Sequence, residues 1–137
     1  MAQYLLDTNI LSDVVRNPTG VVIKKMSRMS REERHTVCTS IVVAGELRFG
    51  GAKKGSAHLI RRIEEVLESV TVLPLEEDAD RHYARLRLQL EKAGSPISGN
   101  DLLIAAHAVA TSSILVTANT REFGRIPDLP IQNWLRP

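Results

Sequence analysis

The chain has 137 residues, of which 43% are hydrophobic and 25% charged, values close to the globular average that exclude a disordered, fibrous or low-complexity chain. This length predicts one domain, residues 1–137. With a net charge of only +2 and 4% aromatic residues, neither bulk charge nor aromatic platforms mark a nucleic-acid binder, so a site for a polyanion must be local.

The sequence also bears on the cellular compartment. Cys38 is the only cysteine and cannot close an intrachain disulfide, and the first residues contain no basic run followed by a long apolar stretch. No run of about 18 apolar residues that could cross a bilayer occurs. We therefore expect a cytoplasmic protein without a membrane partner.

In the first half of the chain, predicted strands and helices alternate. The expected elements are a strand at 4–6, a helix at 9–16, a helix from Thr19 towards Met29, a charged loop at 31–34, a strand at 36–39 and a helix at 42–49. Asn17–Pro18 should stop the first helix, Thr19 should cap the second, and Gly50–Gly51 should end the last.

The second half continues the alternation. The expected elements are a helix from Ser56, a strand at 70–73, a helix from 79 to 93 ended by Gly94, a helix at 101–110, a strand at 114–117 and at most one short strand near Ile131. Strands alternating with helices imply right-handed crossovers. The predicted fold class is therefore α/β, a three-layer α/β/α sandwich with a mostly parallel central sheet.

Polar residues at the strand ends are the first candidates for a site, because ligands of open parallel sheets bind beyond the carboxyl ends of the strands. Asp7 follows the first strand and Asn119 follows the fourth. Glu46 and Asp101 interrupt helices that are otherwise apolar, and neither has a basic residue four positions away. Three acids without local cations predict a divalent ion with oxygen ligands, Mg²⁺ or Mn²⁺ rather than zinc.

Each acid also has a purely structural explanation. Asp7 could cap the helix that follows it, and Asp101 could form a capping box with Ser98. Glu46 lies in the middle of a helix, where only a distant arginine could neutralise it. The four histidines show no zinc spacing, and the glycines of 50–55 lack the lysine of a phosphate-binding loop.

Four blocks of sequence, in order, resemble the PIN-domain ribonucleases, and more narrowly the VapC-type toxins of bacterial toxin–antitoxin pairs. The blocks are LLDTN at 5–9, SIVVAGEL at 40–47, ISGNDLLIAAHA at 97–108 and LVTANTREF at 115–123, and Asn133–Trp134 also fits. The resemblance covers essentially the whole chain. It implies a PIN-like fold and endonucleolytic cleavage of RNA by a metal-activated water.

The resemblance also implies roles for particular residues. Asp7, Glu46 and Asp101 would bind Mg²⁺, with Mn²⁺ able to substitute. Asn119 stands where many relatives have aspartate, so either Asn119 completes the catalytic set through its amide oxygen or Glu122 supplies charge nearby. Two further residues would support the ligands or position water: Thr8 and Asn9.

The resemblance further implies partners: a cognate VapB-like antitoxin, an RNA substrate and a second copy in a homodimer. We expect phosphate contacts from surface basic residues, which otherwise serve only solubility: Lys53, Lys54, Arg121 and Arg125. An apolar groove between the helix near Thr19 and the helix near Ser56 would suit the antitoxin.

Two competing functions follow from the same residues. Because Asn119 replaces an expected acid, the chain could be a catalytically weak toxin-like module that binds RNA or antitoxin. A phosphoacceptor receiver domain would also place acids at the ends of parallel strands, but it requires an aspartate after a central strand in mid-chain, where Thr39–Ser40 stand.

Overall fold

The computed structural model describes residues 1–76 and 78–136, in which strands and helices alternate as predicted. The elements are β1 (Gln3–Leu6), α1 (Thr8–Arg16), α2 (Val21–Ser27), the π-helical turn η1 (Arg28–Glu32), β2 (Thr36–Ser40), α3 (Ile41–Lys54), α4 (Ala57–Glu68), β3 (Thr71–Leu73), α5 (Ala79–Lys92), α6 (Gly99–Ala110), β4 (Ile114–Val116), α7 (Thr120–Phe123) and β5 (Ile131–Gln132). No helix in the described ranges is long and apolar enough to cross a membrane.

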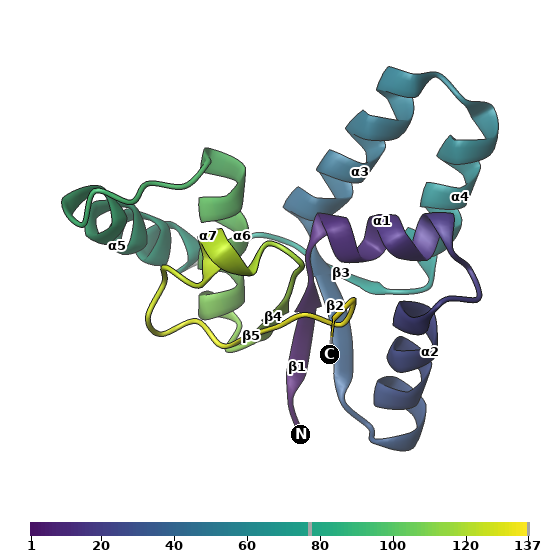
Figure 1. Ribbon diagram of the computed structural model, residues 1–137, viewed down its shortest axis with the longest axis horizontal. Coiled ribbons are helices and arrows are strands. Elements are labelled where there is room, and N and C mark those ends of the chain that lie inside the picture. The colour runs from purple at the N-terminus through teal and green to yellow at the C-terminus, as the bar shows by residue number, and fades with distance from the viewer. Residues whose placement is uncertain (77, 137) are drawn as a thin grey trace.

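The strands form one five-stranded sheet in the order β3-β2-β1-β4-β5, and every neighbouring pair is parallel. Helices α1 to α4 lie on one side of this sheet and α5 to α7 on the other (Figure 1). The α/β sandwich is therefore confirmed. The chain moves outward from β1 to β3 and then returns to β4, so β1 and β4 flank the point where the strand order reverses, which is where open α/β sheets bind ligands.

The core surrounds the central strand β1. Leu5 and Leu6 are both fully buried, because parallel strands covered by helices on both faces have no side open to water. Helix α6, predicted to be central from its apolar sequence, contributes the fully buried Ile104. The thiol of Cys38 is also fully buried and donates to the carbonyl of Tyr4 at 3.4 Å, and burial raises its pKa to about 11.

The prediction that Gly50–Gly51 ends the third helix is wrong. Helix α3 continues to Lys54 and ends at Gly55, whose φ of 66° is the left-handed conformation that favours glycine. Packing explains the difference, because a Cβ at Gly51 would lie 2.9 Å from Cδ1 of Ile63 on α4. The glycine lets the two helices approach closely, and this contact outweighs its low helix propensity.

Three local predictions also differ from the structure. Gly20 rather than Thr19 occupies the cap position of α2. The expected loop at 31–34 begins inside the π-helical turn η1. Helix α7 was not predicted, since four residues are too few to show a helical period.

Candidate active site

Asp7 occupies the centre of the candidate site, at the end of β1. Its side chain is 3% exposed and accepts hydrogen bonds from the backbone N–H of Thr8 at 2.8 Å and the hydroxyl of Thr117 at 2.7 Å. The amide of Asn9 donates to the same carboxylate at 3.3 Å. Burial raises the pKa of Asp7 despite these hydrogen bonds, and the charge of Glu46 raises it further. This carboxylate is therefore held in a place that disfavours its negative charge.

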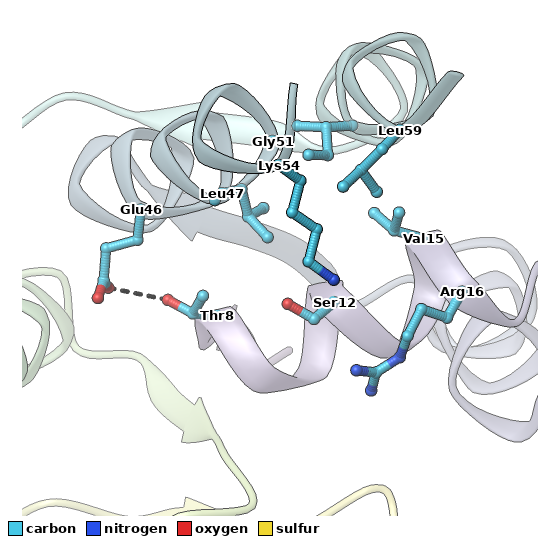
Figure 2. Close-up of a pocket in the computed structure, with 11 residues that line it drawn as sticks. Thr8, Ser12, Val15, Arg16, Glu46, Leu47, Gly51, Lys54 and Leu59 are labelled. Atoms are coloured by element: carbon cyan, nitrogen blue, oxygen red, sulfur yellow. Dashed lines mark hydrogen bonds between the residues drawn. The ribbon is translucent and has the colours of Figure 1, made fainter. Parts of the chain in front are cut away.

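Glu46 reaches the site from α3 and meets Thr8 at the start of α1. The hydroxyl of Thr8 donates to Oε1 of Glu46 at 2.9 Å, and Figure 2 shows the two side chains pointing toward each other. Ser40 begins this helix by accepting from the N–H of Val42 at 3.1 Å, so the end of β2 sets where Glu46 emerges.

Asp101 comes from the first turn of α6, on the other side of the sheet. Ser98 caps this helix by accepting from the N–H of Asp101 at 3.2 Å. The pKa of Asp101 is raised to about 6, first by burial, then by a hydrogen bond with Glu122 and by the charge of Asp7. Glu122 on α7 therefore lies against Asp101, and its role in the site remains a prediction.

One cavity of about 360 Å³, here called the acidic cavity, collects most of the predicted residues. Its lining consists of Asp7, Thr8, Asn9, Ser12, Arg16, Glu46, Asp101 and Asn119. Every acidic or amide side chain in this set offers oxygen, the donor that Mg²⁺ prefers. In the described part of the chain, none of the three acids in it forms a salt bridge, with Arg16 or with any other base.

Asp7, Glu46 and Asp101 do not form a closed set of metal ligands in this structure. Within residues 1–76 and 78–136, no group of three or more His, Cys, Asp or Glu side chains has an arrangement that could hold a metal ion. Glu46 is turned to Thr8, and Asp101 to Glu122. The donor set fits a hard cation that keeps several of its waters and needs only one or two direct carboxylates; the metal roles of these acids remain predictions.

The structural explanations of the acids hold in part. Asp7 does cap α1, but it does so through Oδ1, while Oδ2 accepts from Thr117 and Asn9. Capping therefore accounts for only one of its two oxygens.

The four basic residues predicted to contact phosphates are scattered. Lys54 lines a second cavity next to the acidic one, and the ammonium of Lys53 lies 6.0 Å from the ring centre of the exposed Phe49. Arg125 donates to the carbonyl of Pro96 at 3.2 Å, and Arg121 is exposed on α7. Their contacts with RNA remain predictions.

The apolar groove also differs from its predicted position. The groove that involves α4 is formed with α1 and α3, while the large cavity beside α2 has no lining residue from α4. The reason is that α4 packs against α1 and α3, which separates it from α2.

Thr117 and Ser12 are site residues that the sequence analysis did not identify. The Thr117 hydroxyl donates to Asp7 and accepts from the N–H of Asn119 at 2.9 Å, so it joins the ends of β1 and β4. In the sequence, Thr117 could have been recognised only as a polar residue that directly follows an apolar strand. Ser12 lies one helical turn after Thr8, on the same face of α1.

Comparisons with known proteins identify the family of this chain. The PIN domain family model matches residues 4–129. Ribonuclease VapC1 of Haemophilus influenzae (strain R2866) is 35% identical over 133 residues, covering 97% of this chain and 98% of its own. The tRNA(fMet)-specific endonuclease VapC of Shigella flexneri is 30% identical over 135 residues, covering 98% and 99%.

Solved structures give the same result. VapBC2 from Rickettsia felis, bound to a DNA fragment from their promoter, superposes with a TM-score of 0.90 and 32% identity, covering 96% of this chain and 98% of that one. VapBC-1 from nontypeable Haemophilus influenzae has a TM-score of 0.83 and 35% identity, covering 97% and 98%.

The fold and the match to the family model thus define a PIN domain, and the chain belongs to the PIN domain family. Within that family its relatives over nearly the full length include VapC ribonucleases, which confirms the resemblance found in the sequence. This membership rules out the receiver domain.

Proposed function

We propose that this protein is a metal-dependent endoribonuclease that acts as the toxin of a toxin–antitoxin pair. The observation that supports this best is the convergence of Asp7, Glu46, Asp101 and Asn119 on one cavity without a salt bridge to any of the acids in the described chain. RNA is the proposed substrate because the relatives are named ribonucleases.

In this proposal Asp7, Glu46 and Asp101 hold Mg²⁺ or Mn²⁺, and Asn119 or Glu122 adds a further oxygen. A bound Mg²⁺ would supply positive charge at the scissile phosphate and lower the pKa of an attacking water from about 15.7. The position at the carboxyl ends of β1 and β4 and the all-oxygen donor set support this choice of ion.

The other residues of the site act by holding these ligands. Thr117 and Asn9 fix the orientation of the Asp7 carboxylate, and Thr8 holds Glu46 by its hydroxyl. Asn9 also accepts from the N–H of Ala118 at 2.9 Å, which ties α1 to the segment before Asn119. Substrate binding would therefore meet side chains whose directions are already set.

The test is cleavage of end-labelled RNA by the purified protein in Mg²⁺, with EDTA as the metal-free control. Glu46→Gln should abolish cleavage, and Glu68→Gln, which removes an exposed glutamate of α4, should leave it intact. Equal activity of Glu46→Gln and the parent protein would refute the proposed site. RNA binding without cleavage under Mg²⁺ and Mn²⁺ would favour the weak binding module suggested by Asn119.

The first substrate to test is the initiator tRNA, since the Shigella flexneri relative is named a tRNA(fMet)-specific endonuclease. We also propose a VapB-like antitoxin as partner, because the structural neighbours are VapBC complexes. Titrating the purified antitoxin into the cleavage assay should stop the reaction at a one-to-one ratio; continued cleavage at excess antitoxin would exclude this partner.

Self-association into a homodimer is the remaining proposal. Its support is the apolar surface of α3, where Ile41 is 44% and Phe49 is 68% exposed. Light scattering after size-exclusion chromatography should give twice the chain mass, and Phe49→Ser should give the monomer. A monomeric parent protein at high concentration would contradict this proposal.

A further inference from the structure

A second cavity, of about 280 Å³, adjoins the acidic cavity and shares four residues with it: Thr8, Ser12, Arg16 and Glu46. It lies between α1, α3 and α4, and Figure 2 shows its lining. The two cavities therefore border each other at these residues. We call the second cavity, lined by α1, α3 and α4, the side groove.

Two matching rows of residues form the walls of the side groove. Thr8, Ser12 and Arg16 follow one another at intervals of four on α1, and Glu46, Gly50 and Lys54 do the same on α3. Residues four apart share a helix face, so each row runs along its helix for eight residues, a rise of about 12 Å. The side groove thus begins at a carboxylate of the acidic cavity and ends between two cations.

The cationic end is open to a ligand. Lys54 extends from α3 toward Ser12 and Arg16 on α1 (Figure 2), and both cations are exposed. Neither forms a salt bridge with a residue that the structure describes. Two cations beside one hydroxyl are suited to a phosphate group, which accepts several charge-assisted hydrogen bonds.

Gly50 keeps the middle of the side groove open. A Cβ at this position would meet no atom within 4 Å, whereas at the neighbouring Gly51 it would meet Ile63. The floor is apolar, formed by Val15, Leu47, Leu59 and Ile63. A chain lying there would contact apolar surface between its charged ends.

We infer that the side groove binds the RNA strand next to the scissile bond, with Arg16 and Lys54 holding a backbone phosphate. This inference rests on the proposed function. A strand with regularly spaced charges can place one phosphate at the acidic cavity, where the proposed cation would bind, and a second at the cationic end. Its sugar and base faces can cover the apolar floor between them.

The test measures RNA binding separately from cleavage. In an Asp101→Asn background with EDTA, fluorescence anisotropy of a labelled single-stranded oligoribonucleotide reports affinity at several salt concentrations. Arg16→Gln and Lys54→Gln should each weaken binding about three- to tenfold and lower the slope of log K against log salt by about 0.7. Lys92→Gln is the matched control, since Lys92 is an exposed lysine in the last turn of α5, as Lys54 is in α3.

A further variant tests whether the RNA strand passes through the side groove, without changing the charge of the protein. Gly50→Leu should weaken RNA binding by filling the side groove, and it should keep or raise the melting temperature because it replaces glycine inside a helix in open space. The inference would be overturned if all three variants kept the RNA affinity of the background protein, or if Lys92→Gln lost as much RNA affinity as they did. It would also be overturned if the background protein failed to bind the oligonucleotide.

The same variants distinguish RNA from a peptide occupant. Loss of antitoxin binding with unchanged RNA binding would assign the side groove to the antitoxin and refute our inference. Because affinity is measured without metal, absence of cleavage in Mg²⁺ would refute the proposed function and leave the binding result valid.

Discussion

Replacing Asp101 by asparagine should stabilise the metal-free protein while abolishing its proposed activity. The pKa of Asp101 is raised from 3.8 to about 6, mainly by burial, so the folded state retains a proton that the unfolded chain releases. Stability therefore falls as pH rises from about 3.8 to about 6, and the full cost of ionisation is present above that range. Asparagine never ionises, so it avoids this cost.

The raised pKa sets the size of the effect. A shift of about two pKa units corresponds to about 3 kcal/mol, and solvent screening of this half-buried side chain reduces it to about 1–2 kcal/mol. In EDTA at pH 7.5, Asp101→Asn should raise the melting temperature by about 3–8 °C. The gain in melting temperature should shrink toward zero near pH 4, because Asp101 is then protonated in the folded state and is uncharged like the asparagine that replaces it.

The assay is thermal unfolding across this pH range, followed by circular dichroism, with and without Mg²⁺. Asp128→Asn serves as control, because Asp128 is exposed and its loss should change stability by less than about 0.5 kcal/mol. Added Mg²⁺ should stabilise the parent protein and not Asp101→Asn. A destabilised Asp101→Asn at pH 7.5 in EDTA, or a gain independent of pH, would refute this reasoning.

Three further sets of substitutions test parts of the site and fold. Thr8→Val should lower the cleavage rate about 10- to 100-fold by freeing Glu46, and Thr8→Ser should restore it; equal rates in both would show that the hydroxyl has no role. Gly55→Ala should lower the free energy of unfolding in urea by about 1 kcal/mol, because Gly55 has a positive φ. Gly45→Ala, in open space within α3, should raise it by about 0.5–1 kcal/mol. The opposite order would contradict the helix end described here. Trp134→Ala should cost about 3–5 kcal/mol, since the ring is 1% exposed, and a cost below 1 kcal/mol would place it outside the core.

The sequence predicted the sheet and the nearness of Asp7 and Asn119, because both depend on patterns that one chain displays. Strands alternating with apolar-faced helices leave few topologies, and residues that follow parallel strands must meet at one edge. Asp7 and Asn119 could therefore be placed near each other before any coordinates.

What the sequence could not predict depends on contacts between distant elements. The continuation of α3 past Gly50 follows from the packing of Gly51 against Ile63, twelve residues later. The bond between Thr117 and Asp7 joins residues 110 positions apart, and no local pattern indicates such a partner. The same holds for the turn of Asp101 toward Glu122, which depends on where α7 lies.

The buried thiol of Cys38 can serve as a built-in probe of unfolding, because reagents reach it only when the structure opens. The sulfur belongs to β2, beside the central strand, and alkylating reagents attack the thiolate, which is scarce when the pKa is about 11. Modification must then wait until β2 is uncovered, so the labelling rate under native conditions reports how often this part of the sheet opens rather than how often the loops move. The same enclosure protects this sulfur from peroxide for as long as the strands stay together.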